Sequence, residues 1–161
     1  FDVLIEAFSL AKTKTPNIKL EIIGDGYLKD KLKSIIAKKK LENSITLSGK
    51  ISFADYQKKI NECDVIINSC LKEGGVTLSF DSIAYSKPLI CIDTGGYTKS
   101  FKDISIVLPL TSRYSLVDEM ANEITKMTDY EYRENLIFKL PDHKDKLSWK
   151  TKGNQIKDLF L

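Results

Sequence analysis

The sequence predicts an α/β protein with a Rossmann-like, doubly wound parallel sheet, helices on both faces and a helical C-terminal tail. Short apolar segments alternate along the chain with segments whose apolar residues recur every three or four positions. Glycine-containing loops follow several of the apolar segments. Strands that alternate with helices form parallel sheets covered on both faces. We expect one domain over residues 1–161, with tail helices from about residue 130.

The first half of the chain contains three expected strands. It opens in a helix with Leu4, Ala7 and Phe8 on one face, and this helix ends at Thr15-Pro16, since the residue before proline avoids the helical region. Ser52 is the expected N-cap of a later helix. The expected strands are 18–23, 45–48 and 64–68, and a further helix covers 28 to about 40.

The second half continues the alternation. We expect a helix over about 75–86, strands over 88–92 and 104–108, and a helix capped by Ser115. The remainder is polar and expected to be helical. Its expected apolar anchors are Trp149, Ile156 and Phe160.

Composition restricts the function. The chain has 25 basic and 22 acidic residues and a net charge of only +3, too little to indicate nucleic-acid binding. No signal peptide and no apolar run of about 18 residues is visible, so we expect a cytoplasmic protein. The lysines 38–40 fit a solvated helix face. The alternative is that they bind an anionic membrane surface.

The cysteines and the histidine predict neither a metal nor a cofactor. Cys63 and Cys91 have no metal-binding spacing and are expected to be small core residues in a reducing compartment. Cys70 lies in a glycine-loop region, where a reactive thiol is an alternative to a plain structural role. The structural role is favoured. His143, the single histidine, lies in a polar segment and gives little support to a Ser/His/Asp triad.

The most informative stretch runs from Glu73 to Asp81, with the sequence EGGVTLSFD. It follows a buried strand and opens a helix. A helix start presents free backbone N–H groups and a positive dipole end, both of which favour an anion. Two acidic residues flank this point, so an anion with hydroxyl groups on both sides, such as a nucleotide-sugar, would fit.

Three glycine loops are expected to meet at one edge of the sheet. Residues 24–26, 74–75 and 95–96 each follow an expected strand. The carboxyl ends of parallel strands share one edge, where ligands of such sheets bind. Three such loops together are stronger evidence for a ligand site at this edge than any one of them alone.

These residues resemble a known family. The chain is similar over nearly its whole length to the C-terminal, donor-binding domain of retaining GT-B glycosyltransferases (glycosyl transferases group 1, family 4 type). Seven segments follow the order of that family: 4–8, 20–26, 45–49, 63–67, 73–81, 87–90 and 94–96.

The resemblance implies roles for particular residues. Glu73 would bind the donor sugar hydroxyls, and backbone N–H groups of the loop would hold the diphosphate. Asp81 stands where the family has a second glutamate and would accept hydrogen bonds from the ribose. Other residues of the implied substrate site are Gly74, Gly75, Val76, Thr77, Gly24, Gly26, Lys50 and Ile51, the last two in the base-binding loop.

Plainer roles remain open for these residues. Glu73 fits a helix N-terminal charge, Asp81 a solvated helix residue, and Gly74-Gly75 a simple turn. Residues 24–26 favour a structural turn near the ligand, and 50–51 fit a plain loop equally well.

The resemblance also implies an activity. The donor would be a UDP- or GDP-sugar, and the acceptor a glycan or lipid-linked molecule bound by a preceding domain that this sequence lacks. We expect the chain to be folded but inactive alone, and the whole enzyme to be a hexosyltransferase of cell-surface polysaccharide synthesis. The alternatives are half of a nucleotide-sugar epimerase and a non-catalytic regulatory or protein-binding module.

Overall fold

The structure is a computed structural model that describes residues 1–71, 77–94, 101–146 and 148–157. Its strands are β1 (Leu20–Ile23), β2 (Ile45–Gly49), β3 (Ile66–Asn68), β4 (Leu89–Ile92) and β5 (Ile106–Leu108). Its helices are α1 (Asp2–Lys14), α2 (Lys29–Lys38), α3 (Phe53–Glu62), α4 (Thr77–Ala84), α6 (Arg113–Lys126), α7 (Tyr130–Ile137), α8 (Leu140–Lys146) and α9 (Trp149–Lys157). Residues 73–76 and the loop 95–96 lie outside the described part.

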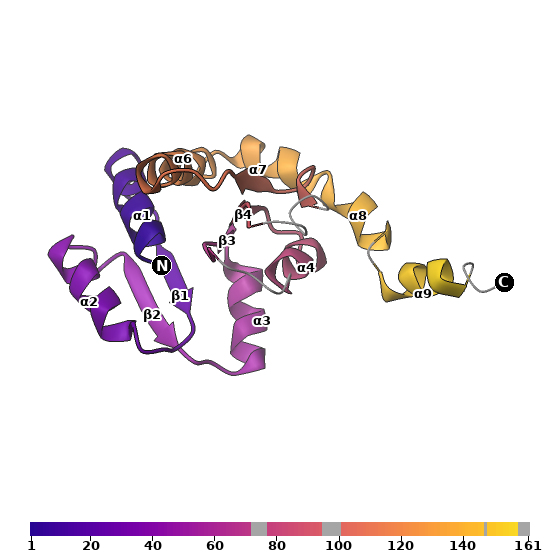
Figure 1. Cartoon of the computed structure of the whole chain (residues 1–161), viewed down its shortest axis with the longest axis horizontal. Helices are drawn as coiled ribbons and strands as arrows, with labels where there is room; N and C mark the ends of the chain where they lie inside the picture. The colour runs from indigo at the N-terminus through magenta and orange to yellow at the C-terminus, as the bar shows by residue number, and fades with distance from the viewer. Residues whose placement is uncertain (72–76, 95–100, 147, 158–161) are drawn as a thin grey trace.

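All described strand pairs are parallel, which confirms the predicted α/β class. Strand β1 pairs with β2, with Leu20 opposite Ile45. Strands β3, β4 and β5 form a second ladder in that order, with Ile66 opposite Leu89. The described strands therefore form two ladders, whereas the sequence predicted one sheet. In Figure 1, β1 and β2 lie to the left of β3 and β4, and α6 runs along the top of the view.

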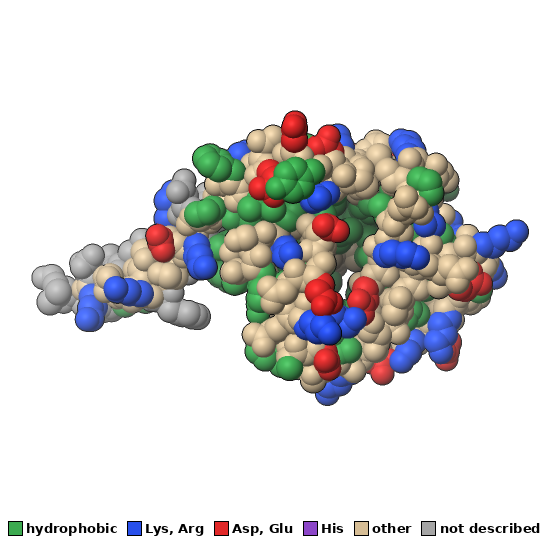
Figure 2. Space-filling model, turned by 180° about the vertical axis from the view of Figure 1, so that it is seen from behind, with side chains coloured by type: hydrophobic (Ala, Val, Ile, Leu, Met, Phe, Trp, Pro, Cys, Tyr) green, Lys and Arg blue, Asp and Glu red, His purple; other side chains and the backbone are tan. Residues whose placement is uncertain are grey.

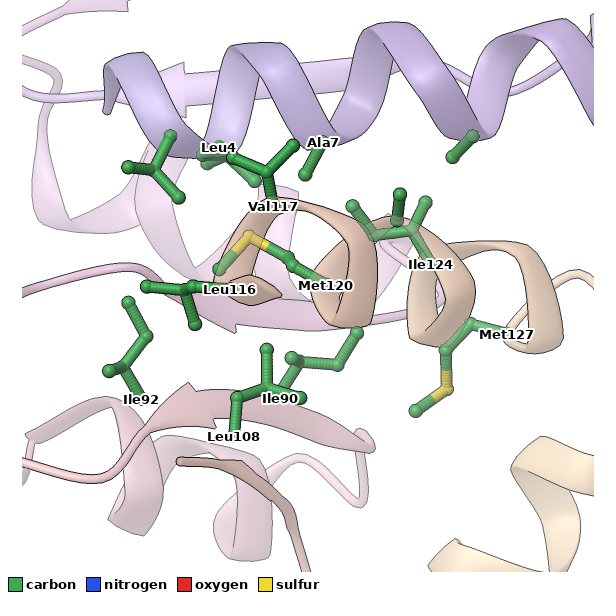
Figure 3. Close-up of a cluster of buried hydrophobic side chains, with 13 residues drawn as sticks. Leu4, Ala7, Ile90, Ile92, Leu108, Leu116, Val117, Met120, Ile124 and Met127 are labelled. Carbon is green, nitrogen blue, oxygen red and sulfur yellow. The ribbon is translucent and has the colours of Figure 1, made fainter. Parts of the chain in front are cut away.

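The main core lies between α1, α6 and the second ladder. Figure 3 shows α6 between α1 and the strands, with Leu116 and Met120 of α6 near Ile90 and Ile92 of β4. Met120 and Ala7 of α1 are completely buried. The small side chain of Ala7 leaves room for α6 to pack closely on α1.

A second core lies on another side of α1. Ile5 and Phe8 of α1 pack with Ile22 of β1 and Ile45 of β2, and α2 covers the group with Leu32. Helix α1 therefore contributes side chains to both cores. This arrangement holds the two ladders in one molecule.

Hydrogen-bonding side chains define where two helices begin. Ser52 caps α3 as predicted, because its hydroxyl accepts a bond of 3.1 Å from the Asp55 N–H. Helix α6 begins three residues earlier than predicted. Its cap is Ser112, which has extended backbone and accepts a bond of 3.2 Å from the N–H of Ser115, so Ser115 lies inside the helix.

The tail is helical as predicted, but its anchor differs. Leu140 at the start of α8 is 1% exposed and packs with Ile83 of α4, Phe101 and Ile104. Ile156 in α9 is 57% exposed, so its prediction as an anchor was wrong. The side chains of Trp149 and Phe160 lie outside the described part. In Figure 1, α8 and α9 lead away from the rest of the molecule, so the tail attaches through α8.

This difference predicts effects of very different size for two similar substitutions. Leu140→Ala should lower the free energy of unfolding by about 2–5 kcal/mol, because it opens a cavity against α4. Ile156→Ala, the matched control, should change it by less than about 0.5 kcal/mol, because the side chain is exposed. Urea denaturation followed by circular dichroism measures both. Equal losses would show that α9 also carries the tail.

Candidate functional site

The loops after β1 and β2 lie side by side. The N–H of Gly24 donates a 2.9 Å hydrogen bond to the carbonyl of Gly49. Gly24 has a φ of 132° and Gly49 a φ of 68°, backbone conformations that side chains disfavour. Gly24, Gly26 and Lys50 are exposed and Ile51 is half-buried. The structure therefore brings together four predicted site residues at this edge.

The start of α4 carries two further predicted residues. Thr77 is its first residue and is exposed, and Asp81 lies one turn later and is half-buried. The Asp81 carboxylate accepts a 2.6 Å hydrogen bond from the phenol of Tyr56. Asp81 is therefore a half-buried, hydrogen-bonded residue and not simply a solvated residue on the surface of the helix. Glu73, Gly74, Gly75 and Val76, which precede α4, lie outside the described residues.

Tyr56 joins the ends of the two ladders. It lies in the first turn of α3, which follows β2, whereas Asp81 lies on the helix that follows β3. Its ring stacks on Phe53 with a centroid distance of 6.4 Å. Burial, and then the hydrogen bond to Asp81, raise the pKa of the Tyr56 phenol well above its usual range. Tyr56 therefore donates from a neutral phenol.

Two buried hydroxyls lie near the same edge. The Oγ of Ser79, in the first turn of α4, and the Oγ1 of Thr94, just after β4, have no hydrogen-bond partner among the described residues. A buried hydroxyl without a partner costs free energy, which a polar ligand or water can recover.

A cleft of about 1170 Å³ separates the two ladders. It is lined by the facing strands β1 and β3 and by residues of α1 and α3. Figure 2 shows a hollow on this side of the molecule, with charged side chains at its rim. Across this cleft, Glu21 of β1 forms a 2.5 Å ion pair with Lys59 of α3.

The surroundings of Glu21 lower the pKa of its carboxyl group. Burial acts to raise this pKa, but hydrogen bonds from Lys59 and Ser48 together outweigh that effect. The carboxylate is therefore held in its charged form, opposite the Lys59 ammonium, and the ion pair persists at neutral pH.

The described residues contain no group of three or more His, Cys, Asp and Glu side chains that could hold a metal ion. None of the described helices is long and apolar enough to cross a membrane. Cys91 is buried, which raises its pKa to about 11, and burial also raises the pKa of the half-buried Cys63. Cys70 is the exposed cysteine.

The sequence did not single out two polar residues of this region. Tyr56 and Lys59 both lie in the helix that Ser52 was expected to cap. Their partners are Asp81, 25 residues along the chain, and Glu21 on another element. Periodicity describes one helix at a time, so no signal in the sequence could have found these pairs.

The parallel α/β fold is that of a GT-B glycosyltransferase domain, and comparison with known proteins gives the family. Residues 1–139 match the family described as Glycosyl transferases group 1. The chain belongs to this family, which confirms the resemblance to group 1 glycosyltransferases found in the sequence.

Two curated relatives are also glycosyltransferases. A glycosyltransferase of Methanocaldococcus jannaschii is 36% identical over 90 residues, covering 56% of this chain and 22% of its own length. The poly(ribitol-phosphate) alpha-N-acetylglucosaminyltransferase of Staphylococcus aureus is 27% identical over 92 residues, covering 57% of this chain and 18% of its own length. The matched segment therefore spans about a fifth of each relative.

A solved structure shares the fold. The pneumococcal O-GlcNAc transferase GtfA, in complex with UDP and GlcNAc, superposes with a TM-score of 0.84 and 20% identity. The match covers 98% of this chain and 32% of that chain. This likeness supports the Rossmann-like architecture of the whole chain.

The hydrogen bond between Tyr56 and Asp81 predicts a titration effect. Asp81→Asn should lower the pKa of Tyr56, because it removes the negative charge beside the phenol. The pKa of Tyr132, raised to about 12 by burial and Glu123, should stay unchanged and serves as the internal control. NMR of tyrosine carrying a ¹³C label next to the hydroxyl measures both.

The same bond predicts how stability depends on pH. Folding raises the pKa of Tyr56 above the unfolded value of about 10. The protonated phenol therefore contributes its full share to the free energy of unfolding below about pH 10, and this contribution is lost as the pH rises further. Asp81→Asn should reduce this alkaline loss. An unchanged Tyr56 titration in the variant would show that the bond is absent in solution.

Proposed function

We propose that this chain is the donor-binding domain of a retaining glycosyltransferase that uses a nucleotide-diphosphate sugar. Its family membership makes it part of a glycosyltransferase. The pneumococcal neighbour contains UDP and GlcNAc, and it shares this fold. A UDP- or GDP-sugar is therefore the proposed donor.

The observation that carries the proposal is the placement of Asp81. Its half-buried carboxylate lies one turn into α4, behind the helix start that would face a diphosphate. A carboxylate accepts hydrogen bonds from two neighbouring hydroxyls, which suits a ribose. The buried hydroxyls of Ser79 and Thr94 supply polar groups in the same region.

The remaining residues take complementary parts in this proposal. Glu73 binds the sugar hydroxyls and favours the positive charge that develops at the anomeric carbon. Backbone N–H groups of residues 74–77 hold the diphosphate. The loops containing Gly24, Gly26, Lys50 and Ile51 lie beside one another at the edge of the first ladder, where they would border the nucleotide.

The reaction needs a second binding surface. The bond from the anomeric carbon to the diphosphate breaks with its electron pair leaving on the diphosphate oxygen. The acceptor hydroxyl oxygen bonds to the same face of that carbon, and its proton passes to the departing diphosphate. Donor and acceptor must be held in one closed site. We place the acceptor, a glycan or lipid-linked molecule, on a separate domain, and expect this chain alone to be inactive.

The cellular setting follows from the same proposal. The relative from Staphylococcus aureus is described as acting on poly(ribitol-phosphate), a polymeric acceptor. Synthesis of a cell-surface polysaccharide on the cytoplasmic side, with a peripheral contact to the membrane, fits such an acceptor.

Nucleotide binding tests the placement of the site. Titration of the ¹⁵N-labelled chain with UDP or GDP should shift amide signals within 24–26, 49–51, 73–81 and 94–96, because the proposal places the nucleotide among these segments. Adenosine, which carries no phosphate, serves as the control. Shifts confined to other parts of the chain would place the nucleotide elsewhere.

Glu73→Gln tests the sugar-side role. In the protein that joins this chain to its acceptor domain, turnover should fall by at least about tenfold, equivalent to about 1.4 kcal/mol of barrier, because the charge near the anomeric carbon is lost. Affinity for free UDP or GDP should stay nearly unchanged. Turnover within about twofold of the original would remove Glu73 from the catalytic role.

A further inference from the structure

We propose that Tyr56 is a positioning residue that fixes the Asp81 carboxylate for the ribose hydroxyls of the donor nucleotide. This inference rests on the proposed function and deepens it. It adds to the nucleotide site a residue on α3, a helix that the glycine loops did not implicate.

The hydrogen bond engages one side of the carboxylate. The phenol of Tyr56 donates to Oδ2 of Asp81 over 2.6 Å. Among the described residues, the Asp81 carboxylate has no other hydrogen bond or ion pair, so Oδ1 keeps its capacity to accept. A carboxylate has about four acceptor positions. One donor from the protein therefore orients the group and leaves most of these positions for a ligand.

The short side chain of aspartate makes such support useful. Asp81 has two side-chain torsions, and both must be fixed before a bond to a ribose can form. Fixing them in the free protein lowers the entropy lost on binding. A half-buried carboxylate with a charge-assisted hydrogen bond is held more firmly than one in water.

Tyr56 is itself held in place. Its ring stacks on Phe53 and packs at the edge of the core formed by Ile60, Ile66 and Leu89. Helix α3 is fixed at its start by the Ser52 cap. The phenol therefore acts from a rigid element, and its raised pKa keeps it a donor throughout the neutral range.

A neighbouring phenol provides a matched control. Tyr85, just beyond α4, accepts a 3.1 Å hydrogen bond from the side chain of Gln57, the residue after Tyr56. The backbone N–H of Tyr85 donates to the Asp81 carbonyl, but its phenol has no hydrogen bond to the Asp81 carboxylate among the described residues. Tyr85→Phe therefore removes one hydroxyl from the same region without touching the Asp81 carboxylate.

The test uses the present chain and four ligands. UDP and GDP are titrated by NMR, and the tighter binder is compared with its 2′-deoxy and 3′-deoxy forms. In the original chain, at least one deoxy form should bind several-fold more weakly. Tyr56→Phe should weaken the parent nucleotide roughly threefold to tenfold and reduce the deoxy penalty, because a mobile carboxylate grips the ribose less well. Tyr85→Phe should leave both values unchanged.

A double-mutant cycle separates positioning from a merely structural role. In an Asp81→Ala background, Tyr56→Phe should have no further effect on nucleotide affinity, because the residue that it positions is gone. Losses that simply add would overturn the inference. Amide spectra and urea unfolding of each variant establish that it is folded before its affinity enters the cycle.

The other outcomes are equally decisive. An unchanged deoxy penalty in Tyr56→Phe overturns the positioning role and leaves the proposed function standing. Tighter binding by that variant shows that Tyr56 shields Asp81 from the ligand, which also overturns it. Failure of the original chain to bind either UDP or GDP at millimolar concentrations counts against the proposed nucleotide site, and the inference falls with it.

Discussion

The structure depends on a single helix that is apolar on two sides. Helix α1 sends Leu4 and Ala7 toward α6 and the second ladder, and Ile5 and Phe8 toward the first ladder. An ordinary surface helix has one apolar stripe and one core. Because α1 packs in two cores, the relative position of the two ladders follows from how this helix packs. Arg113 of α6 reinforces the contact with ion pairs of 2.9 Å to Asp2 and Glu6 of α1.

Helix α3 connects the same two parts on the polar side. Near its start Tyr56 reaches Asp81, and one turn later Lys59 reaches Glu21 across the cleft. The first contact joins α3 to the helix after β3, and the second joins it to β1. An apolar link through α1 and a polar link through α3 thus hold the two ladders, and the proposed nucleotide site lies beside the polar link.

The class of the fold and the order of its elements were predictable because they follow from local information. Apolar periodicity and glycine positions are properties of short segments, and the helices and strands occur where these indicated. Helix ends were less certain: Ser112 and Ser115 both suit a cap, and only the backbone conformation distinguishes them. The separation into two ladders could not be read from periodicity, which does not reveal which strands pair.

The site was predictable only in part, for the same reason. The sequence indicated the loops at 24–26 and 50–51, and the structure places them side by side. It indicated Asp81, but not the phenol of Tyr56, because a contact between two helices has no local signature. The tail shows the converse: Ile156 had a suitable side chain, but Leu140 lies where α4 offers a partner.

The unequal exposure of the three cysteines makes the chain suited to optical measurement. Thiol-directed dyes react with accessible thiolates, and burial raises the pKa of both Cys63 and Cys91. Cys70 is exposed and follows β3 by two residues, close in sequence to Glu73. A fluorophore attached there reports from the neighbourhood of the proposed donor site, and no cysteine has to be introduced. The unmodified sequence thus already contains an attachment point for following ligand entry in real time.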